Sequence, residues 1–269
     1  MKIYCPSHKR PDAPLFSIAN NLIIVLQHKE EIEEYKRLNE PRGHQIVCID
    51  IDGNQRILEA RNWIIQQDDD WSLQIDDDIT GFNVWNKDSQ CYEQIDWERF
   101  IDEGEKIVTE IDLNKTGMIR FGGKHIVPNE NKKFEIMKEG FLWFPSAIIN
   151  NKLLKLKNFK YEGHYIFDNS LGKFKTYGDD YFIQYWCQDN NFNVVLLNHL
   201  AIELTNCEWE NSTLYNEDYS MDDVMSQTFK WLLKKFKYNN ALTSEIIKKY
   251  IYHVKGTKSF LSHKSISHE

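Results

Sequence analysis

The sequence predicts an α/β protein in which a mostly parallel, doubly wound sheet is flanked by helices and followed by a C-terminal helical extension. Two observations predict this fold. Apolar, β-branched runs alternate with amphipathic segments up to residue 75, and three aspartates directly follow the last of these runs. Such alternation is typical of parallel sheets, whose ligands bind beyond the carboxyl ends of the strands. For 269 residues we expect one main domain at 1–206 and an extension at 207–269.

The N-terminal third carries the clearest strand and helix patterns. Five consecutive apolar residues within 21–27 suit a strand that is covered on both faces, and the segment 2–5 ends at a proline. Strands are expected at 2–5, 21–27, 45–51 and 71–75, with helices at 28–38 and 57–67 between them. These segments predict the β-α-β order of a parallel sheet.

The rest of the chain gives fewer patterns. We expect strands at 117–121, 140–144 and 192–197, a helix at 180–188, and a loop or hairpin at 122–139, which contains two adjacent glycines and four lysines. Ser220 is placed to cap a helix whose apolar residues recur at 225, 229, 232 and 236. A second helix is expected at 247–254. Both helices belong to the predicted extension.

Several features narrow the class of protein. No apolar run reaches the roughly 18 residues of a membrane span, and no apolar stretch follows the charged N-terminus, so we expect a cytoplasmic protein without a membrane partner. The five cysteines are scattered and never spaced as C-x-x-C. This pattern favours neither a disulfide framework nor a zinc site.

The charge is distributed unevenly. The chain carries a net charge of −8, yet residues 225–265 contain nine lysines and one glutamate. A basic segment on an acidic body can indicate contact with nucleic acid, and the loop at 122–139 adds further lysines. The alternative is an ordinary solvated helix face.

Asp76, Asp77 and Asp78 are the strongest candidates for chemistry. Three adjacent carboxylates repel one another unless a cation or hydrogen-bond donors compensate them, and Mg²⁺ or Mn²⁺ takes such oxygens together with phosphate oxygens. A second acidic triplet at 68–70 lies in a polar turn before the strand, where we expect an ordinary loop. The sequence therefore predicts a metal site at 76–78 only.

The order of short motifs resembles a known superfamily. A-R-N at 60–62, D-D-D at 76–78, G-F-L-W-F-P at 140–145, Y-G-D-D-Y at 177–181 and the strand near 190–197 follow one another as in the GT-A-type nucleotide-diphospho-sugar glycosyltransferases. The opening Y-C-P-S-H-K-R-P and the A-R-N-W run look most similar to the phage and kinetoplastid-type enzymes that glycosylate hydroxymethylated pyrimidines in DNA. The resemblance implies a nucleotide-diphosphate sugar donor, with a UDP-sugar favoured, and Mn²⁺ or Mg²⁺. If phage-encoded, the protein would act in the host cytoplasm.

The resemblance also implies roles for single residues. Donor contacts fall on Pro6, Ser7, Arg10, Arg61, Asn62, Asp76 and Asp77, and metal contacts on Asp76, Asp78 and His199. Asp77 is the more structural of the three aspartates. Two of these roles have a plain alternative, because Arg61 could form a surface ion pair and His199 could be a satisfied structural histidine.

The family's acidic catalytic pair corresponds here to Asp179 and Asp180, with aspartate in place of the usual first glutamate. The resemblance assigns the general base to Asp180. The alternative is a helix N-terminal pair that the helix dipole favours. A single base without a covalent intermediate would invert the anomeric centre, and a retaining mechanism stays open.

Four functions remain in competition. The first is transfer of a sugar to a 5-hydroxymethylpyrimidine in DNA, as in phage DNA modification, with an extruded base received by Trp143, Phe144 and Tyr181. The second is a glycosyltransferase acting on a glycan, lipid or protein, and the third is a metal-dependent phosphohydrolase or nuclease. A calcium-binding module ranks last, because the regular spacing of calcium loops is missing. The sugar, the nucleotide and the oligomeric state are not determined by the sequence.

Overall fold

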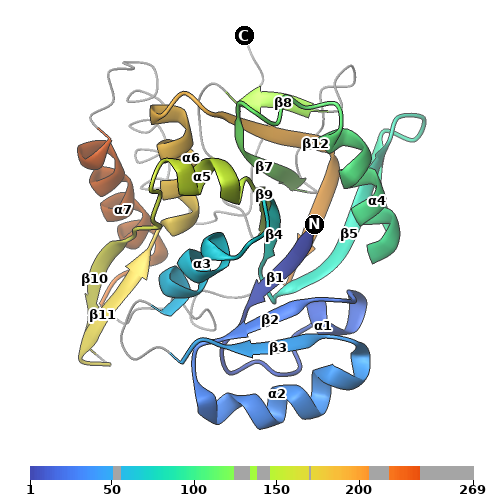
Figure 1. The fold of residues 1–269 in the computed structure, drawn as a ribbon. Coiled ribbons are helices and arrows are strands. Elements are labelled where there is room, and N and C mark those ends of the chain that lie inside the picture. The colour runs from blue at the N-terminus through green and yellow to red at the C-terminus, as the bar shows by residue number, and fades with distance from the viewer. Residues whose placement is uncertain (51–55, 124–133, 138–145, 170, 206–217, 237–269) are drawn as a thin grey trace.

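The computed structural model describes residues 1–50, 56–123, 134–137, 146–169, 171–205 and 218–236 (Figure 1). Within these ranges a ten-stranded sheet runs through the molecule in the order β3-β2-β1-β4-β9-β7-β12-β5-β6, with β8 paired to β12. The strands are β1 (Lys2–Pro6), β2 (Ile23–Leu26), β3 (Gln45–Cys48), β4 (Ser72–Ile75), β5 (Ile79–Asn86), β6 (Cys91–Ile95), β7 (Thr116–Gly123), β8 (Phe134–Met137), β9 (Ser146–Ile149) and β12 (Asn193–Leu204). A separate hairpin is formed by β10 (His164–Asp168) and β11 (Lys173–Tyr177).

Helices flank this sheet in the described part of the chain (Figure 1). They are α1 (Leu15–Ile18), α2 (Ile32–Asn39), α3 (Arg56–Gln66), α4 (Trp97–Val108), α5 (Asn151–Leu156), α6 (Asp179–Asp189) and α7 (Met221–Lys235), with short 3₁₀ turns η1 (Lys29–Glu31) and η2 (Glu40–Arg42). None of these helices combines the length and the apolar character that crossing a membrane requires.

The two halves of the sheet differ in strand direction. Strands β3, β2, β1 and β4 run parallel to one another, which confirms the α/β pattern predicted from the first third of the chain. Beyond β4 the sheet is mixed, because β9 is antiparallel to both β4 and β7, and β5 is antiparallel to both β12 and β6. The turn between β5 and β6 is short, as antiparallel neighbours allow. All four residues of β4 are buried, and residues 76–78 follow at the carboxyl end of this strand.

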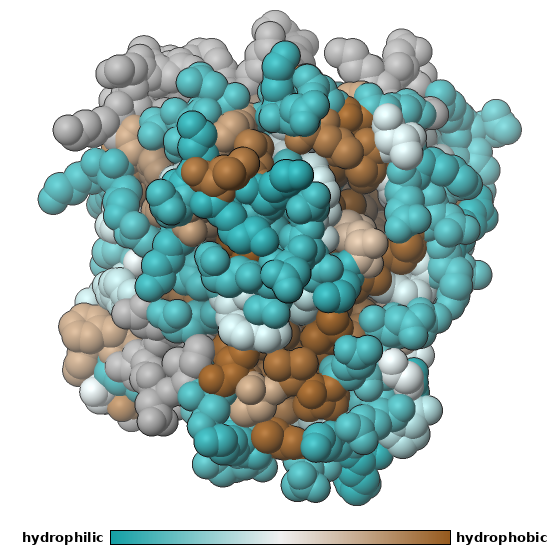
Figure 2. All heavy atoms as spheres, viewed as in Figure 1, coloured by the Kyte–Doolittle hydropathy of each residue, from teal (hydrophilic) through white to brown (hydrophobic). Residues whose placement is uncertain are grey.

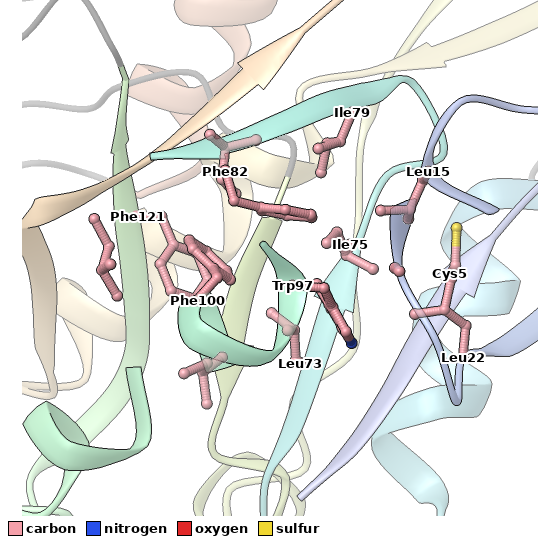
Figure 3. Packing of buried hydrophobic residues seen from close by; sticks show 14 of the residues in the cluster. Cys5, Leu15, Leu22, Leu73, Ile75, Ile79, Phe82, Trp97, Phe100 and Phe121 are labelled. Atoms are coloured by element: carbon pink, nitrogen blue, oxygen red, sulfur yellow. The ribbon is translucent and has the colours of Figure 1, made fainter. Parts of the chain in front are cut away.

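The core on one face of the sheet is aromatic. Phe100 of α4 packs against Phe82 and Phe121, with 4.7 Å between ring centroids in each pair (Figure 3). Asp96 caps α4 by accepting a hydrogen bond of 2.8 Å from the backbone N–H of Arg99. Neither α4 nor the β5–β6 hairpin was predicted, although the Asp96 cap and the apolar spacing that follows it are visible in the sequence.

The opposite face is covered by α6 and α7. Phe229 of α7 packs against Tyr181 of α6 at 5.2 Å between centroids, and Ser220 caps α7 as predicted, accepting from the N–H of Asp223 at 3.2 Å. Tyr181 is therefore a buried core residue, 4% exposed, and the prediction that it receives an extruded base is wrong for this conformation. Gly178, at φ +79°, leads into α6, and a Cβ there would come within 2.3 Å of Thr228.

Some predicted elements are altered and others are not described. Strand β12 extends to Leu204, so His199 lies within the strand and not at its end. The ends of the segment 122–139 belong to β7 and β8, and its remainder lies outside the described residues. The strand at 140–144, the helix at 247–254, Trp143, Phe144 and the boundary near 206 also lie outside them. Cys5, Cys48, Cys91 and Cys187 are free thiols.

Hydrophilic side chains cover most of the face shown in Figure 2, and hydrophobic side chains gather near its centre. A groove of about 420 Å³ opens at the amino ends of β1 and β2 and is bordered by α4. Its lining includes Met1, Ile3, Trp97 and Ile101. This groove lies at the opposite edge of the sheet from residues 76–78, since those residues follow the carboxyl end of β4.

Candidate active site

Asp77 ties the end of β4 to the loop after β1. Asp77 lies in the turn between β4 and β5 and is buried, with 6% of its surface exposed. It accepts hydrogen bonds from the Ser7 hydroxyl at 2.6 Å and from Nη1 of Arg10 at 2.8 Å. Burial raises the pKa of Asp77, and the Arg10 guanidinium opposes that rise. Ser7 and Arg10 thus reach the predicted site, where both are held by a carboxylate.

Arg61 of α3 joins the two acidic motifs. Its guanidinium lies 3.2 Å from Asp76 and 2.9 Å from Asp179, and its side chain is only 14% exposed. Burial alone would lower the pKa of Arg61, but Asp179 and Asp76 outweigh it and raise that pKa. The guanidinium also lies 5.9 Å from the centre of the Tyr161 ring. Arg61 is a buried bridge between carboxylates, so the alternative of a surface ion pair is wrong.

Asp78 has one oxygen with no partner. Its Oδ1 is buried and accepts no hydrogen bond from any described residue, while its backbone carbonyl accepts from the N–H and the hydroxyl of Thr205, each at 3.0 Å. Burial raises the pKa of Asp78, and Arg10 opposes it. Burial likewise raises the pKa of Asp76, against the effect of Arg61. A buried carboxylate oxygen without a donor is costly, so Asp78 favours a cationic ligand.

Asp180 lies beside Asp179 in the first turn of α6 and is half-buried. Its Oδ2 has no hydrogen-bond partner among the described residues. Burial and the neighbouring Asp179 raise its pKa to about 7, while Arg61 opposes the shift. Gln184 donates to the backbone carbonyl of Asp180 at 2.9 Å and accepts a hydrogen bond from the fully buried Arg120 of β7. Such a pKa suits a general base near neutral pH.

A small cavity of about 20 Å³ connects these groups. This volume corresponds to about one water molecule. The residues around it include Pro6, Arg61, Gln74, Asp76, Tyr161 and Asp180. Pro6 therefore lines the site, and the two acidic motifs share one enclosed space although about a hundred residues separate them in the chain.

Two predicted site residues are placed elsewhere. Asn62 accepts a hydrogen bond of 2.7 Å from the backbone N–H of Tyr161, which holds that ring beside Arg61. In the antiparallel pair of β12 with β5, Leu204 lies opposite Ile79, so His199 lies five residues farther along β12, roughly 17 Å away at the usual rise of a strand. The structure does not bring His199 to the aspartates.

The remaining carboxylates fit a hard divalent cation. Among the described residues no three of these carboxylates bring their oxygens within 4.8 Å of one another, so this part of the chain supplies at most two close ligands. Mg²⁺ sites commonly use one or two carboxylates, with the other positions taken by substrate phosphates and water. Asp78 and Asp76 follow the same strand end and are the two candidates.

Comparison with known proteins bears on this geometry. The model of the family described as TET-Associated Glycosyltransferase (TAGT) matches residues 1–165. The chain belongs to this family. The matched range holds Arg61 and the aspartates at 76–78, whereas Asp179 and Asp180 follow it. The protein is a glycosyltransferase.

Solved structures agree on the fold. The TAGT chain is similar to TarS 1–349 of S. aureus in complex with UDP-GlcNAc, at 12% identity and a TM-score of 0.54, over 95% of this chain and 72% of that one. A weaker likeness, with a TM-score of 0.45 and 10% identity, is to GalNAc-T7 with UDP, GalNAc and Mn²⁺, over 94% of this chain and 57% of that one. The fold is thus that of GT-A glycosyltransferases. No curated protein matches the sequence.

The structure also adds residues that sequence reasoning missed. Tyr161 and Gln74 line the cavity of the TAGT chain, and Arg120 with Gln184 supports the start of α6. No local motif marks these residues, because each acts on a partner at least 60 positions away or across the sheet.

Proposed function

We propose that this TAGT protein transfers a sugar from a nucleotide-diphosphate donor, a UDP-sugar, to a 5-hydroxymethylpyrimidine in DNA, and that it needs Mn²⁺ or Mg²⁺. Donor and metal would meet at Asp76 and Asp78, and Asp180 would remove the proton of the acceptor hydroxyl. The family match supports the reaction class. The UDP-GlcNAc in the TarS complex is consistent with the choice of donor.

The charge balance of the site carries the proposal. Five carboxylates face three guanidinium groups, so the site has a formal charge of −2 when all are ionised, which one divalent cation would neutralise. The groups are Asp76, Asp77, Asp78, Asp179 and Asp180 with Arg10, Arg61 and Arg120. Burial raises the pKa values of Asp76, Asp78 and Asp180, and the neighbouring arginines oppose that rise without cancelling it. A bound divalent cation would stabilise the charge that develops on the leaving diphosphate.

The other residues have roles that follow from their contacts. Arg61 fixes the spacing between Asp76 and Asp179, so it would set the donor side against the acceptor side. Asp180, with a pKa of about 7, is partly ionised at neutral pH and would accept the hydroxyl proton as the new bond forms. Ser7 and Arg10 hold Asp77 and keep the loop after β1 in place, where the donor's nucleotide would lie.

DNA as the acceptor is supported by the family description and by the basic C-terminal segment. In the described part of that segment, α7 presents Lys230 on an exposed position, while Lys235 pairs with Glu162. Phosphate contacts by lysine make binding strongly salt-dependent. This dependence separates DNA from the other acceptor classes.

The donor is tested by thermal unfolding with a panel of nucleotide sugars, with and without Mn²⁺. The proposal expects one donor and Mn²⁺ together to raise the unfolding midpoint by more than the sum of their separate effects, because each is bound next to the other. Additive effects would contradict a shared site.

The acceptor is tested with oligonucleotides that contain 5-hydroxymethylcytosine or 5-hydroxymethyluracil, with the unmodified sequence as control. We expect sugar transfer to the hydroxymethylated strands and a steep fall in affinity for DNA with salt. Transfer to a glycan, lipid or protein, but not to DNA, would favour the second acceptor class. Donor hydrolysis without any acceptor-linked product would favour a phosphohydrolase.

A further inference from the structure

A second group of possible metal ligands lies apart from the aspartates. His8 follows β1, whereas His28 and Glu31 lie three residues apart in the segment that follows β2, so two segments converge at the carboxyl edge of the parallel strands. One potential ligand atom from each lies within 4.8 Å of the others. In the described part of the chain, no other group of three His, Cys, Asp or Glu side chains brings its potential ligand atoms this close together.

The distances suit a small cation after modest shifts of the side chains. Nδ1 of His8 lies 2.7 Å from Oε1 of Glu31, and the His8 and His28 ring centroids are 5.2 Å apart. Bonds of about 2.0–2.1 Å in tetrahedral geometry separate ligand atoms by about 3.3 Å. The three side chains would therefore need shifts on the order of 1 Å, which loop side chains can make.

One atom of the group has no partner. Nε2 of His28 is buried from solvent and forms no hydrogen bond with any described residue. A buried imidazole nitrogen without a partner loses its hydration and gains nothing in return, unless a ligand occupies the position. This observation is independent of the convergence of the three side chains.

The surroundings hold the ligands in place. The backbone N–H of Lys9 donates to Oε2 of Glu31 at 2.7 Å, which orients that carboxylate, and Lys9 adopts a left-handed conformation with φ 56° to do so. Outer hydrogen bonds of this kind are typical of metal-binding carboxylates.

We propose that His8, His28 and Glu31 form a second metal site that takes a borderline-soft divalent cation such as Zn²⁺. Two imidazoles and one carboxylate are a donor set that suits Zn²⁺, whereas the all-carboxylate cluster suits Mg²⁺ or Mn²⁺. Water would fill the fourth position. The ion would fasten the loop after β1 to the start of α2.

The test uses full-length protein stripped of metal by a chelator and titrated with Co²⁺, a spectroscopic substitute for Zn²⁺. The Asp78→Asn variant serves as the background, so that the aspartate cluster does not compete for the ion. We expect one equivalent of Co²⁺ to bind with the strong visible absorption of a four- or five-coordinate, nitrogen-containing site, and Zn²⁺ to displace it.

His28→Ala on this background should weaken Co²⁺ binding at least about 10- to 100-fold. Loss of a residue that only supports a ligand usually weakens binding by this much, and in the proposal His28 binds the ion directly. His28→Gln and Glu31→Gln check that the loss does not come from misfolding, with the metal-free unfolding midpoint as the measure. Glu30→Gln, at the exposed neighbouring position, is the matched control and should bind as the background does.

Equal Co²⁺ affinity and spectrum in His28→Ala and its background would overturn the proposal, and so would the absence of Co²⁺ binding in the background. No donor or acceptor enters the experiment, so its failure is separate from a failure of the proposed sugar transfer.

Discussion

Strand β4 has three aspartates before it and three after it, and the two triplets differ in their contacts. Three aspartates precede the strand at 68–70 and three follow it at 76–78. At the amino end, Asp69 accepts from the Tyr4 hydroxyl at 2.6 Å and pairs with Lys2 at 3.3 Å. At the carboxyl end, Asp78 keeps a buried oxygen without any described donor.

At the amino end of β4, Asp69 and Asp70 also contact residues of α5. The backbone carbonyl of Asp69 accepts from Asn151 at 3.3 Å, and Asp70 lies 3.5 Å from the Lys152 ammonium. These contacts join the turn to α5 and serve the fold. Carboxylates that are paired or solvated cost little, whereas buried ones without partners persist only where a ligand compensates them. The two triplets have the same composition, and they differ in their partners: the contacts of the triplet at 68–70 serve the fold, whereas the triplet at 76–78 keeps a carboxylate oxygen without a described donor.

The largest effect on activity is expected from a change at Asp180, which lines the same cavity as Asp76 at the carboxyl end of β4. Asp180→Asn should lower the rate of sugar transfer by about 10²- to 10⁴-fold, because it removes a general base. Donor binding should persist, since Asp180 holds no donor contact in the proposal. Single-turnover transfer and UDP-sugar thermal shifts measure the two effects, and near wild-type transfer would place the base elsewhere.

Asp78→Asn should lower kcat/KM by about 10²- to 10³-fold, somewhat less than the effect of Asp180→Asn. This is the usual loss when one electrostatic contact to the charge that develops in the transition state is removed. It should also abolish the cooperative stabilisation by Mn²⁺ and UDP-sugar. Asp70→Asn is the matched control at the other end of β4 and should keep both properties. A cooperative shift that survives in Asp78→Asn would contradict the metal assignment.

A change of pH should produce a smaller effect. The base is active when ionised, so kcat/KM should rise as pH increases through about 7 and fall about tenfold per unit below it. The same raised pKa makes the fold less stable as pH rises from about 4 toward 7, because the unfolded carboxyl releases its proton near 3.9. Denaturant titrations of wild type and Asp180→Asn would compare the slopes, and identical slopes would contradict the assigned pKa.

Tyr4→Phe should leave activity unchanged and affect stability alone. The variant removes the hydrogen bond to Asp69, and bonds to charged groups are worth about 1.5–3 kcal/mol. Urea unfolding measures the loss. A fall in kcat/KM without a fall in stability would show that the amino-end triplet also serves catalysis.

Local sequence patterns were sufficient for part of the fold. The local patterns predicted β1 to β4 together with α2 and α3, but not the short α1, and the cap at Ser220 predicted the start of α7. The hairpin β5–β6 and α4 were missed, although Asp96 is a recognisable cap. Beyond β4 the strand directions followed from packing, so the parallel pattern of the first third did not extend to them.

The candidate site divides in the same way. The triplet at 76–78 and the pair at 179–180 were predicted, together with Arg61, Ser7 and Arg10. Tyr161 and Arg120 were not, because each contacts its partners across long sequence separations. His199 was expected at a strand end, and the longer β12 carried it away.

The sequence by itself determined that a buried strand ends in three carboxylates and that a second acidic pair begins a helix, because apolar runs and acidic residues are local properties of the chain. Only the tertiary structure decided that Arg61 joins the two, that Tyr181 is enclosed under α7, and that His8 meets His28. The reason is physical: hydrogen bonds and ion pairs act over a few ångströms, and only the packing of the sheet and helices decides which distant residues come that close.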